Sequence, residues 1–280
     1  MTTILYPEQR YPNDWIEREV LGRRADLRIR DVPALAALTD ADRAGVTALV
    51  LHAIPASAED LAAFPSLRAI VRTGPADIAA TALPIHDVTG HATTELADHT
   101  MAMALALHRG LLQGSATPRR SSALTFAIIG LGRVGTAVAL RAKAFGFKIL
   151  FHDPHIQPGL EDALGITRAK TLPSLLLKAD IISIHTTEIP NLLGLPELTI
   201  LPHGAIVVNT THGTTLDRAA LLSLLHESQI AAAALDLAPD DADPAPIPGR
   251  LLITRHASTS AQATDDLRRR TAEVLAALNE

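Results

Sequence analysis

Phe126-Ala127-Ile128-Ile129-Gly130-Leu131-Gly132-Arg133-Val134-Gly135 runs from four apolar residues into three glycines with the spacing Gly-x-Gly-x-x-Gly. In such a motif the first glycine permits a tight turn, the second lets the backbone approach a pyrophosphate, and the third lets the helix pack closely on the strand. The N-terminus of the following helix offers free N–H groups and a partial positive charge to phosphates. The stretch therefore predicts a strand, a turn and a helix that bind a dinucleotide through Gly130, Gly132, Arg133, Val134 and Gly135.

A second apolar segment, residues 147–151, leads to Asp153, which lies 18 residues after Gly135. A carboxylate at about this distance from the glycines binds the ribose 2′-hydroxyl of a dinucleotide. A 2′-phosphate would meet the negative charge of Asp153, so the sequence favours NAD over NADP as the cofactor. The alternative interpretation is a glycine-rich turn in an α/β domain that binds no nucleotide.

The composition is that of a globular protein with an ample core. Of the 280 residues, 48% are hydrophobic and 20% are charged, and the formal net charge is −5. This balance makes nucleic acid or an anionic membrane an unexpected partner, and no apolar run is long enough for a membrane span. The first ten residues lack the layout of a signal peptide, so we expect a cytoplasmic protein.

The side chains of the sequence limit the chemistry that it can perform. It contains no cysteine, which excludes disulfides, thiolate nucleophiles and Cys-ligated metals. Redox chemistry would therefore come from a bound cofactor. There are 12 histidines, but Pro154 separates His152 from His155 and no His-Glu-x-x-His helix occurs. We expect no metal site.

Strands and helices alternate along the first ninety or so residues. We expect strands at residues 4–6, 27–30, 46–52 and 67–71, and helices at residues 14–21 and 57–64, the second opened by Ser57 as a capping residue. Prolines punctuate these units at short intervals, which is typical of turns rather than long linkers. This part of the chain is expected to form a small α/β domain.

The alternation continues through the rest of the chain. A helix is expected at residues 94–112, with Leu96, Met103, Leu107 and Leu111 on its buried face. Short strands that are apolar throughout, such as residues 180–185, 205–209 and 231–236, are typical of a parallel sheet covered by helices on both faces. Because such sheets bind ligands beyond the carboxyl ends of their strands, one crevice should contain the glycine turn, Asp153, His185, residues 209–213 and Asp236.

The order of these segments resembles the D-isomer-specific 2-hydroxyacid dehydrogenases. The resemblance is carried by Arg72-Thr73-Gly74, Glu95-Leu96-Ala97-Asp98-His99-Thr100, the glycine turn, Ile184-His185-Thr186, Val207-Val208-Asn209 through Gly213, Ala234-Leu235-Asp236 and His256-Ala257-Ser258. It implies two Rossmann-like, doubly wound parallel-sheet domains, with an NAD-binding domain (residues 94–259) inserted in a substrate domain (residues 1–93 and 260–280). It also implies a homodimer, and hydride transfer between a nicotinamide and C2 of a 2-hydroxy or 2-keto acid.

The resemblance also implies roles for individual residues. His256 stands where the family has its general acid/base, and Asp241 is the nearest equivalent of the acid that raises the pKa of that imidazole, although the family usually has glutamate there. Asp236 matches the ligand of the nicotinamide carboxamide. The remaining matches are residues that line the cofactor, namely Thr100, His185, Thr186 and Thr210, and the substrate-binding loop of Arg72, Thr73 and Gly74.

Two departures from the family pattern affect the substrate end of the site. His212 occupies the position of the arginine that grips the substrate carboxylate, and a neutral imidazole cannot replace a guanidinium fork. Pro75 follows Gly74 in a loop that usually presents backbone N–H groups, and proline has none. The sequence therefore predicts an NAD-dependent dehydrogenase or reductase whose substrate is a small carboxylic acid or related carbonyl compound. A non-catalytic NAD(H)-binding sensor or scaffold is the alternative.

Overall fold

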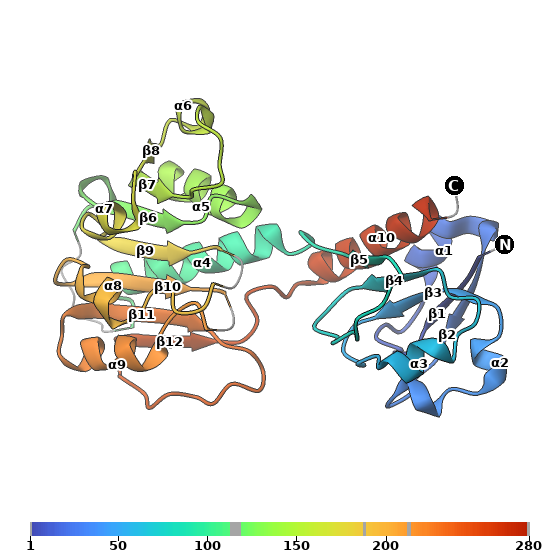
Figure 1. Ribbon diagram of the computed structural model, residues 1–280. Helices are drawn as coiled ribbons and strands as arrows, with labels where there is room; N and C mark the ends of the chain where they lie inside the picture. The colour runs from blue at the N-terminus through green and yellow to red at the C-terminus, as the bar shows by residue number, and fades with distance from the viewer. Residues whose placement is uncertain (1, 113–118, 187–188, 212–213, 279–280) are drawn as a thin grey trace. The chain divides into compact units, whose positions relative to one another are not determined.

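The computed structural model describes residues 2–112, 119–186, 189–211 and 214–278 (Figure 1). The chain forms two compact units. Unit 1 consists of Met1–His91 and Ser260–Glu280, and unit 2 consists of Ala92–Thr259. Unit 1 is thus built from both ends of the chain.

The described part of unit 1 contains a parallel sheet of five strands in the order β2-β1-β3-β4-β5. Its strands are β1 (Thr2–Tyr6), β2 (Ala25–Ile29), β3 (Val46–Leu51), β4 (Ala69–Arg72) and β5 (Ile85–Asp87). Its helices are α1 (Trp15–Leu21), α2 (Asp40–Arg43), α3 (Ala58–Ala62) and α10 (Ala261–Ala277), with 3-10 turns at Gly22–Arg24 and Leu35–Ala37.

Helix α10 packs against α1, so the C-terminal segment completes unit 1. The contact contains a buried ion pair in which Arg268 donates from Nε and Nη2 to the two carboxylate oxygens of Glu17, at 2.8 and 2.6 Å. The two side chains are only 5% and 3% exposed. A buried pair of this kind is sensitive to the loss of either partner, because the remaining charge stays buried without compensation.

The described residues of unit 2 form a parallel sheet of seven strands in the order β12-β11-β10-β9-β6-β7-β8. Its strands are β6 (Thr125–Ile129), β7 (Lys148–His152), β8 (Thr167–Arg168), β9 (Ile181–Ile184), β10 (Ala205–Asn209), β11 (Ile230–Asp236) and β12 (Leu251–Thr254). Its helices are α4 (Thr93–His108), α5 (Arg133–Ala144), α6 (Leu160–Leu164), α7 (Leu172–Leu176), α8 (Leu195–Thr199) and α9 (Arg218–His226), with a 3-10 turn at Ser121–Ala123.

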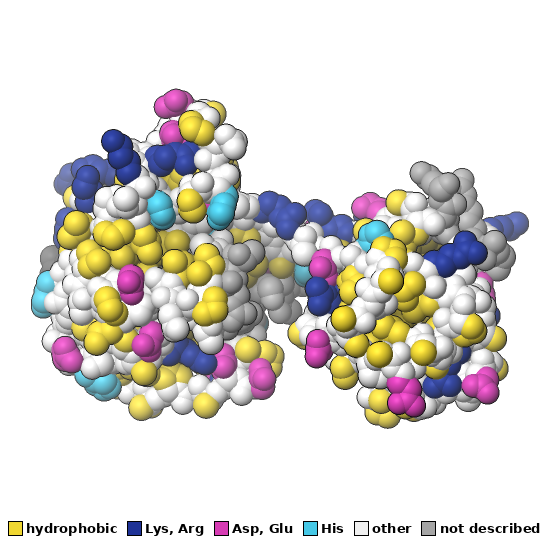
Figure 2. All heavy atoms as spheres, in the orientation of Figure 1, with side chains coloured by type: hydrophobic (Ala, Val, Ile, Leu, Met, Phe, Trp, Pro, Cys, Tyr) yellow, Lys and Arg dark blue, Asp and Glu magenta, His cyan; other side chains and the backbone are white. Residues whose placement is uncertain are grey.

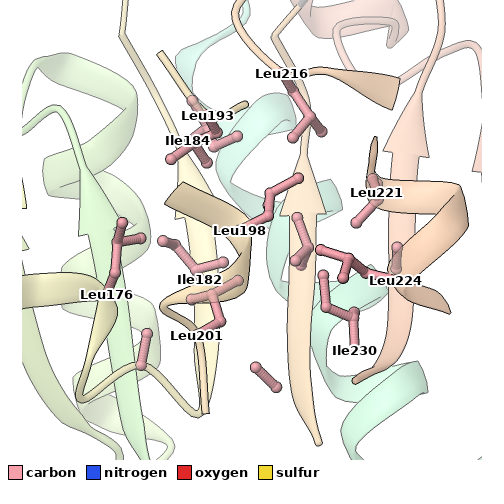
Figure 3. Packing of buried hydrophobic residues seen from close by; sticks show 14 of the residues in the cluster. Leu176, Ile182, Ile184, Leu193, Leu198, Leu201, Leu216, Leu221, Leu224 and Ile230 are labelled. Atoms are coloured by element: carbon pink, nitrogen blue, oxygen red, sulfur yellow. The ribbon is translucent and has the colours of Figure 1, made fainter. Parts of the chain in front are cut away.

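Helices cover both faces of the unit 2 sheet because the strand residues alternate between two apolar cores. Phe126 and Ile128 of β6 face the core that contains residues of α4 and α5. Ala127 and Ile129 face the other core, onto which leucines of α7, α8 and α9 point (Figure 3). Strands buried on both faces are apolar throughout, which is the pattern present in the sequence. The predicted fold class, two α/β units with parallel sheets, is confirmed.

The strand order of unit 2 reverses at β6. The chain proceeds from β6 outward to β7 and β8, and then returns to place β9 on the other side of β6. The loops after β6 and β9 therefore leave the same edge of the sheet in opposite directions. In open α/β sheets a ligand binds at such a switch point.

Some individual elements agree with the sequence-based prediction and others do not. Ser57 caps α3 as expected, accepting a hydrogen bond from the Asp60 backbone N–H at 3.1 Å. The placement of Leu111 on the buried face of a helix is wrong. Gly110 adopts a φ of +66° just beyond α4, so Leu111 leaves the helical period and is 72% exposed. The short strand β5 was not predicted, because its three residues contain no buried apolar run.

The surface carries both signs of charge. On the face drawn in Figure 2, acidic and basic side chains are interspersed among hydrophobic ones, and basic side chains do not form a continuous surface there. None of the helices in the described ranges is both long enough and apolar enough to cross a membrane. Within those same ranges, no group of three or more His, Asp or Glu side chains is arranged to hold a metal ion.

Candidate functional site

The glycine turn follows β6, at the switch point of the unit 2 sheet. Gly130 has a φ of +86°, which residues with a side chain rarely adopt, and a Cβ there would lie 2.7 Å from the His185 carbonyl oxygen. A Cβ on Gly135 would overlap the Gly130 carbonyl oxygen, whereas a Cβ on Gly132 would meet nothing within 4 Å. Two glycines therefore close the turn, and Gly132 borders open space.

Helix α5 begins directly after Gly132, which is its N-cap residue. Arg133 and Val134 form the first turn, and Val134 packs onto the neighbouring apolar core. The first N–H groups of a helix have no partner within the helix. Open space beside Gly132 therefore adjoins the N-terminus of α5, where the helix dipole is positive, an arrangement suited to a phosphate group.

Asp153 lies beside the glycine turn. Its Oδ2 accepts a hydrogen bond from the Leu131 backbone N–H at 2.8 Å, and its Oδ1 accepts one from the His155 backbone N–H at 2.9 Å. Arg168 donates from Nη1 to the Asp153 backbone carbonyl oxygen at 3.3 Å, and from Nε and Nη2 to the two carboxylate oxygens of Glu161, at 2.8 Å each. The negative charge of Asp153 thus lies next to the turn, and the neighbouring positive charge is bound to another carboxylate.

His185 and Thr186 follow β9 and border the turn from the other side. The imidazole Nε2 of His185 lies 2.7 Å from the Ser183 hydroxyl. Burial lowers the pKa of His185 to about 3, so this imidazole is neutral in neutral solution. The Thr186 hydroxyl is buried and has no hydrogen-bond partner among the described residues. A buried hydroxyl without a partner beside the glycine turn fits a ligand with a polar group there.

Thr100 and Thr210 meet although they are 110 residues apart in sequence. The two buried hydroxyls lie 3.3 Å apart, and Thr100 also donates to the Leu96 carbonyl oxygen at 2.7 Å. Thr210 follows β10, where the Asn209 side-chain oxygen accepts hydrogen bonds from Thr211. His212, the candidate for contact with a substrate carboxylate, lies outside the described residues.

Asp236 ends β11 and fixes the segment that carries His256. Its Oδ1 accepts hydrogen bonds from the Thr254 hydroxyl at 2.7 Å, from the His256 backbone N–H at 3.0 Å and from the Ala257 backbone N–H at 3.2 Å. The carboxylate is 5% exposed, whereas the His256 side chain is exposed. The structure therefore places an accessible imidazole on a backbone held by a buried carboxylate.

Asp241 belongs to the loop between β11 and β12. Its Oδ1 accepts a hydrogen bond from Arg218 at 3.0 Å and its Oδ2 accepts one from the Ala238 backbone N–H at 3.1 Å. Arg255 donates to the Asp241 carbonyl oxygen and to the Asp243 carboxylate, at 2.7 Å each. The hydrogen bonds described for the Asp241 carboxylate thus hold it to α9 and to its own loop.

A second histidine, for which no role was predicted, lies beside His256. His99 of α4 lies edge-on to His256, with ring centroids 5.1 Å apart and an interplanar angle of 79°. The neighbouring Thr100 of the same helix was predicted to line the cofactor. His99 lies in residues 95–100, a segment that carries the family resemblance, and this was its only signal in the sequence. No local pattern links it to His256, which lies more than 150 positions later.

In unit 1 the candidate substrate-binding residues are Arg72, the last residue of β4, and Thr73 and Gly74 of the following loop. Arg72 donates from Nε and Nη2 to the two carboxylate oxygens of Asp87, at 2.5 and 3.0 Å. The Thr73 hydroxyl lies 3.2 Å from the Leu51 carbonyl oxygen. A Cβ on Gly74 would overlap the His52 imidazole, so Gly74 is needed for that ring to lie where it does.

A small pocket adjoins this loop within unit 1, and of the residues in its lining Thr73 was predicted as a site residue whereas Tyr6, Arg10 and His52 were not. Its lining includes Tyr6, Arg10, His52 and Thr73. The Arg10 guanidinium lies 2.7 Å from the His52 Nδ1. The Tyr6 hydroxyl is buried without a hydrogen-bond partner among the described residues, and burial raises its pKa. These residues come from the ends of β1, β3 and β4, so the pocket follows from the parallel topology.

Comparison with known families matches residues 90–258 to the NAD binding domain of D-isomer specific 2-hydroxyacid dehydrogenases. Two curated relatives are D-3-phosphoglycerate dehydrogenases, from Mycobacterium leprae and Mycobacterium bovis, which are 33% and 34% identical over 243 residues. The matched region covers 78% of this chain and 45% of each relative. The chain thus spans about half the length of the curated relatives that it matches.

Solved structures share the fold. A D-lactate dehydrogenase from Aquifex aeolicus, complexed with NAD and lactic acid, superposes with a TM-score of 0.78 at 19% identity and covers 99% of this chain and 95% of its own. A glyoxylate reductase from Paecilomyes thermophila gives a TM-score of 0.82 at 20% identity, covering 100% of this chain and 95% of its own. At these identities the likeness concerns the fold alone.

Proposed function

Because the chain belongs to the D-isomer specific 2-hydroxyacid dehydrogenase family, we propose that it is an NAD-dependent oxidoreductase acting on the CH–OH group of a small 2-hydroxy acid, or on the corresponding 2-keto acid or carbonyl compound. The observation that carries the proposal is the anchoring of His256. A buried carboxylate, Asp236, holds an exposed imidazole in the unit that contains the glycine turn. A general acid/base in a fixed position is what removal of a hydroxyl proton requires.

The described residues fit an NAD cofactor. Gly132 borders open space, Asp153 supplies a carboxylate for a ribose hydroxyl, and Thr186 supplies a buried hydroxyl without a partner among these residues. The hydrogen bonds described for Asp236 all end on Oδ1, which supports the use of Oδ2 for a carboxamide N–H. When bound, NAD(H) supplies or accepts the hydride.

His256 is the proposed general acid/base. During oxidation its imidazole takes the proton of the substrate hydroxyl, and during reduction it returns that proton to the carbonyl oxygen. Asp241 is the proposed acid that tunes this imidazole. Since the described hydrogen bonds tie Asp241 to Arg218 and Ala238, the assignment implies that Asp241 changes partners in the working enzyme.

The substrate carboxylate is assigned to Arg72, Thr73 and Gly74, together with His212. The Arg72 guanidinium already binds Asp87, so a substrate would have to compete with that carboxylate. Pro75 removes one backbone N–H from the same loop. These two features favour a site that binds its acid substrate weakly or that accepts few acids.

The test is an NADH-oxidation screen against glyoxylate, pyruvate, hydroxypyruvate and larger 2-keto acids. His256→Ala should reduce the rate by roughly 100-fold or more, the usual contribution of a positioned acid/base. His226→Ala, which removes an exposed imidazole at the end of α9, is the matched control and should retain the rate. Unchanged turnover in His256→Ala would remove the assigned acid/base.

The same observations on Arg72 and Pro75 favour a second candidate, a non-catalytic NAD(H)-binding sensor or scaffold. In that case NADH binds to the chain, and none of the 2-keto acids in the screen is reduced. Turnover of any of them at an ordinary enzymatic rate would exclude this candidate.

We further infer a homodimer. Large apolar side chains are exposed on α5 and just beyond α4 and α5: Leu140 is 48%, Phe145 is 55% and Leu111 is 72% exposed. Exposed apolar side chains are common at subunit interfaces. Sedimentation equilibrium tests this inference, and a monomeric mass at micromolar concentration would contradict it.

We also propose the cytoplasmic location that was expected from the sequence. Cell fractionation tests this proposal.

A further inference from the structure

The contact between His99 and His256 joins two distant parts of unit 2. His99 lies on α4, and His256 follows β12. The His99 ring is half-buried, and its centroid is 5.1 Å from that of His256. Because the edge of one ring meets the face of the other, His99 limits the orientations that the exposed His256 imidazole can adopt.

A hydrogen-bonded chain fixes His99 in turn. The Nε2 of His99 lies 3.0 Å from the Thr254 hydroxyl oxygen, and the Thr254 hydroxyl lies 2.7 Å from the Asp236 Oδ1. An ionised carboxylate can only accept hydrogen bonds, so the single hydroxyl proton of Thr254 points to Asp236. The Thr254 oxygen must then accept from His99. His99 therefore carries a proton on Nε2.

The same Asp236 oxygen that ends this chain accepts the backbone N–H of His256. His256 is thus held twice, through its backbone by Asp236 and at its ring by His99. Both constraints end at Asp236, and the one at the ring also passes through Thr254, which lies opposite Asp236 on the neighbouring strand.

Several charged groups surround His99. Burial lowers its pKa, the Asp236 carboxylate raises it, and a positive charge on His256 lowers it. The carboxylate of Asp98, the preceding residue, is bound by Arg141 of α5 at 2.6 Å. Since two adjacent imidazoles disfavour each other's protonated forms, the protonation of each ring depends on the other.

We infer that His99 is a positioning residue for His256: its Nε2–H, bound to Thr254 and through it to Asp236, holds the ring that orients the catalytic imidazole. The inference rests on the proposed role of His256. It adds that a second imidazole, His99 of α4, orients the acid/base. In this proposal His99 does not contact the substrate.

Two pairs of variants test the chain. His99→Leu removes the Nε2–H donor, whereas His99→Gln keeps a side-chain N–H. Thr254→Val removes the hydroxyl at nearly constant shape, whereas Thr254→Ser keeps it. We expect kcat to fall by roughly 10- to 100-fold in His99→Leu and Thr254→Val, since small misplacements of a catalytic group cost this much. The losses should be smaller in His99→Gln and Thr254→Ser.

The pH profile separates positioning from a merely structural role. In His99→Leu the His256 imidazole loses the neighbouring ring that competes with it for protons. The acidic limb of the profile for hydroxy-acid oxidation should therefore move to higher pH. Equal losses in both members of each pair, with an unmoved acidic limb and a lowered unfolding temperature, would overturn the inference.

Nuclear magnetic resonance of the two imidazoles gives a readout that does not need turnover. Ring nitrogen shifts should show the proton of neutral His99 on Nε2, and the pKa of His99 should rise in His256→Ala. If no substrate is turned over but these couplings are present, the proposed activity fails while the His99 contact stands. A proton on Nδ1 only, with no coupling between the rings, overturns the positioning inference itself.

Discussion

Each of the two units is a parallel sheet covered by helices, but the units differ at the carboxyl ends of their strands. In unit 2 the glycine turn leaves open space beside Gly132, at the N-terminus of α5. The Thr186 hydroxyl, which has no hydrogen-bond partner among the described residues, lies beside the turn. In unit 1 the His52 ring lies directly against Gly74, and Arg72 is bound to Asp87. Glycine at a strand end thus does not by itself make a ligand site. The neighbouring side chains decide whether the space above it is open.

The units also differ in what completes them. Unit 2 is held by two apolar cores, one on each face of its sheet. Unit 1 also has two apolar cores, and α10 contributes Leu267, Ala272 and Leu275 to one of them. In addition, Arg268 of α10 forms a buried ion pair with Glu17 of α1. Apolar packing tolerates small changes better than an ion pair tolerates the loss of one partner. Variants of the two kinds should therefore affect the units unequally.

The largest expected effect is on unit 1. Arg268→Leu leaves the Glu17 carboxylate buried and unpaired, and should cost about 3–5 kcal/mol of unfolding free energy. The double variant Arg268→Leu/Glu17→Leu should recover part of that loss, because no charge stays buried. Urea denaturation of both variants measures the difference. A single variant no less stable than the double variant would contradict the account of this contact.

The next effect distinguishes the glycines of unit 2. Gly135→Ala places a methyl group against the Gly130 carbonyl oxygen and should destabilise the protein by roughly 1–3 kcal/mol. Gly132→Ala meets no atom within 4 Å, so it should leave stability nearly unchanged while NADH affinity falls. Thermal unfolding and calorimetric titration measure the two quantities. Equal stability losses in both variants would mean that Gly132 does not border open space.

A smaller effect should appear as a pH dependence of stability. The pKa of His185 is about 3 in the folded protein, against an ordinary value of 6.5. Between these values the unfolded chain binds a proton that the folded protein does not, so stability falls as the pH falls through this window. His185→Gln should make the dependence less steep there. Urea midpoints measured across the window provide the check, and an unaltered slope would show that His185 does not titrate as described.

The smallest effect concerns cofactor choice. Asp153→Ser should weaken NADH binding by roughly tenfold, about the loss of one hydrogen bond to a charged group, and should weaken NADPH binding less. Asp162→Ser, which changes an exposed acid on α6, is the control. Equal affinities of the unaltered protein for NADH and NADPH would remove the assignment of Asp153 to the ribose hydroxyl.

The parts of the molecule that were predicted correctly are those determined by local sequence. Strand β10 spans the predicted residues 205–209, and Ser57 caps α3 as its position indicated. The glycine turn was predicted because a strand, three glycines and a helix are contiguous in the sequence. Leu111 failed as a core residue since a single glycine, Gly110, ended the helical period before it.

The contacts that organise the proposed site are not local. Asp236 is tied to Thr254 and His256, and His99 reaches His256 from a helix at the other end of unit 2's sequence. Such pairs depend on the order of strands in the sheet, for which no short pattern exists. The alternative hydrogen bonds of Asp241 and Arg72 were unforeseen for the same reason: Arg218 and Asp87 are distant in sequence.

The most direct test of the central claim follows the hydride itself. The protein is incubated with NADH deuterated at C4 of the nicotinamide and with the panel of 2-keto acids, and the products are analysed by mass spectrometry. The account predicts a 2-hydroxy acid that carries deuterium at C2, and a loss of that product in His256→Ala. NADH binding without deuterium in any product of the panel would contradict it.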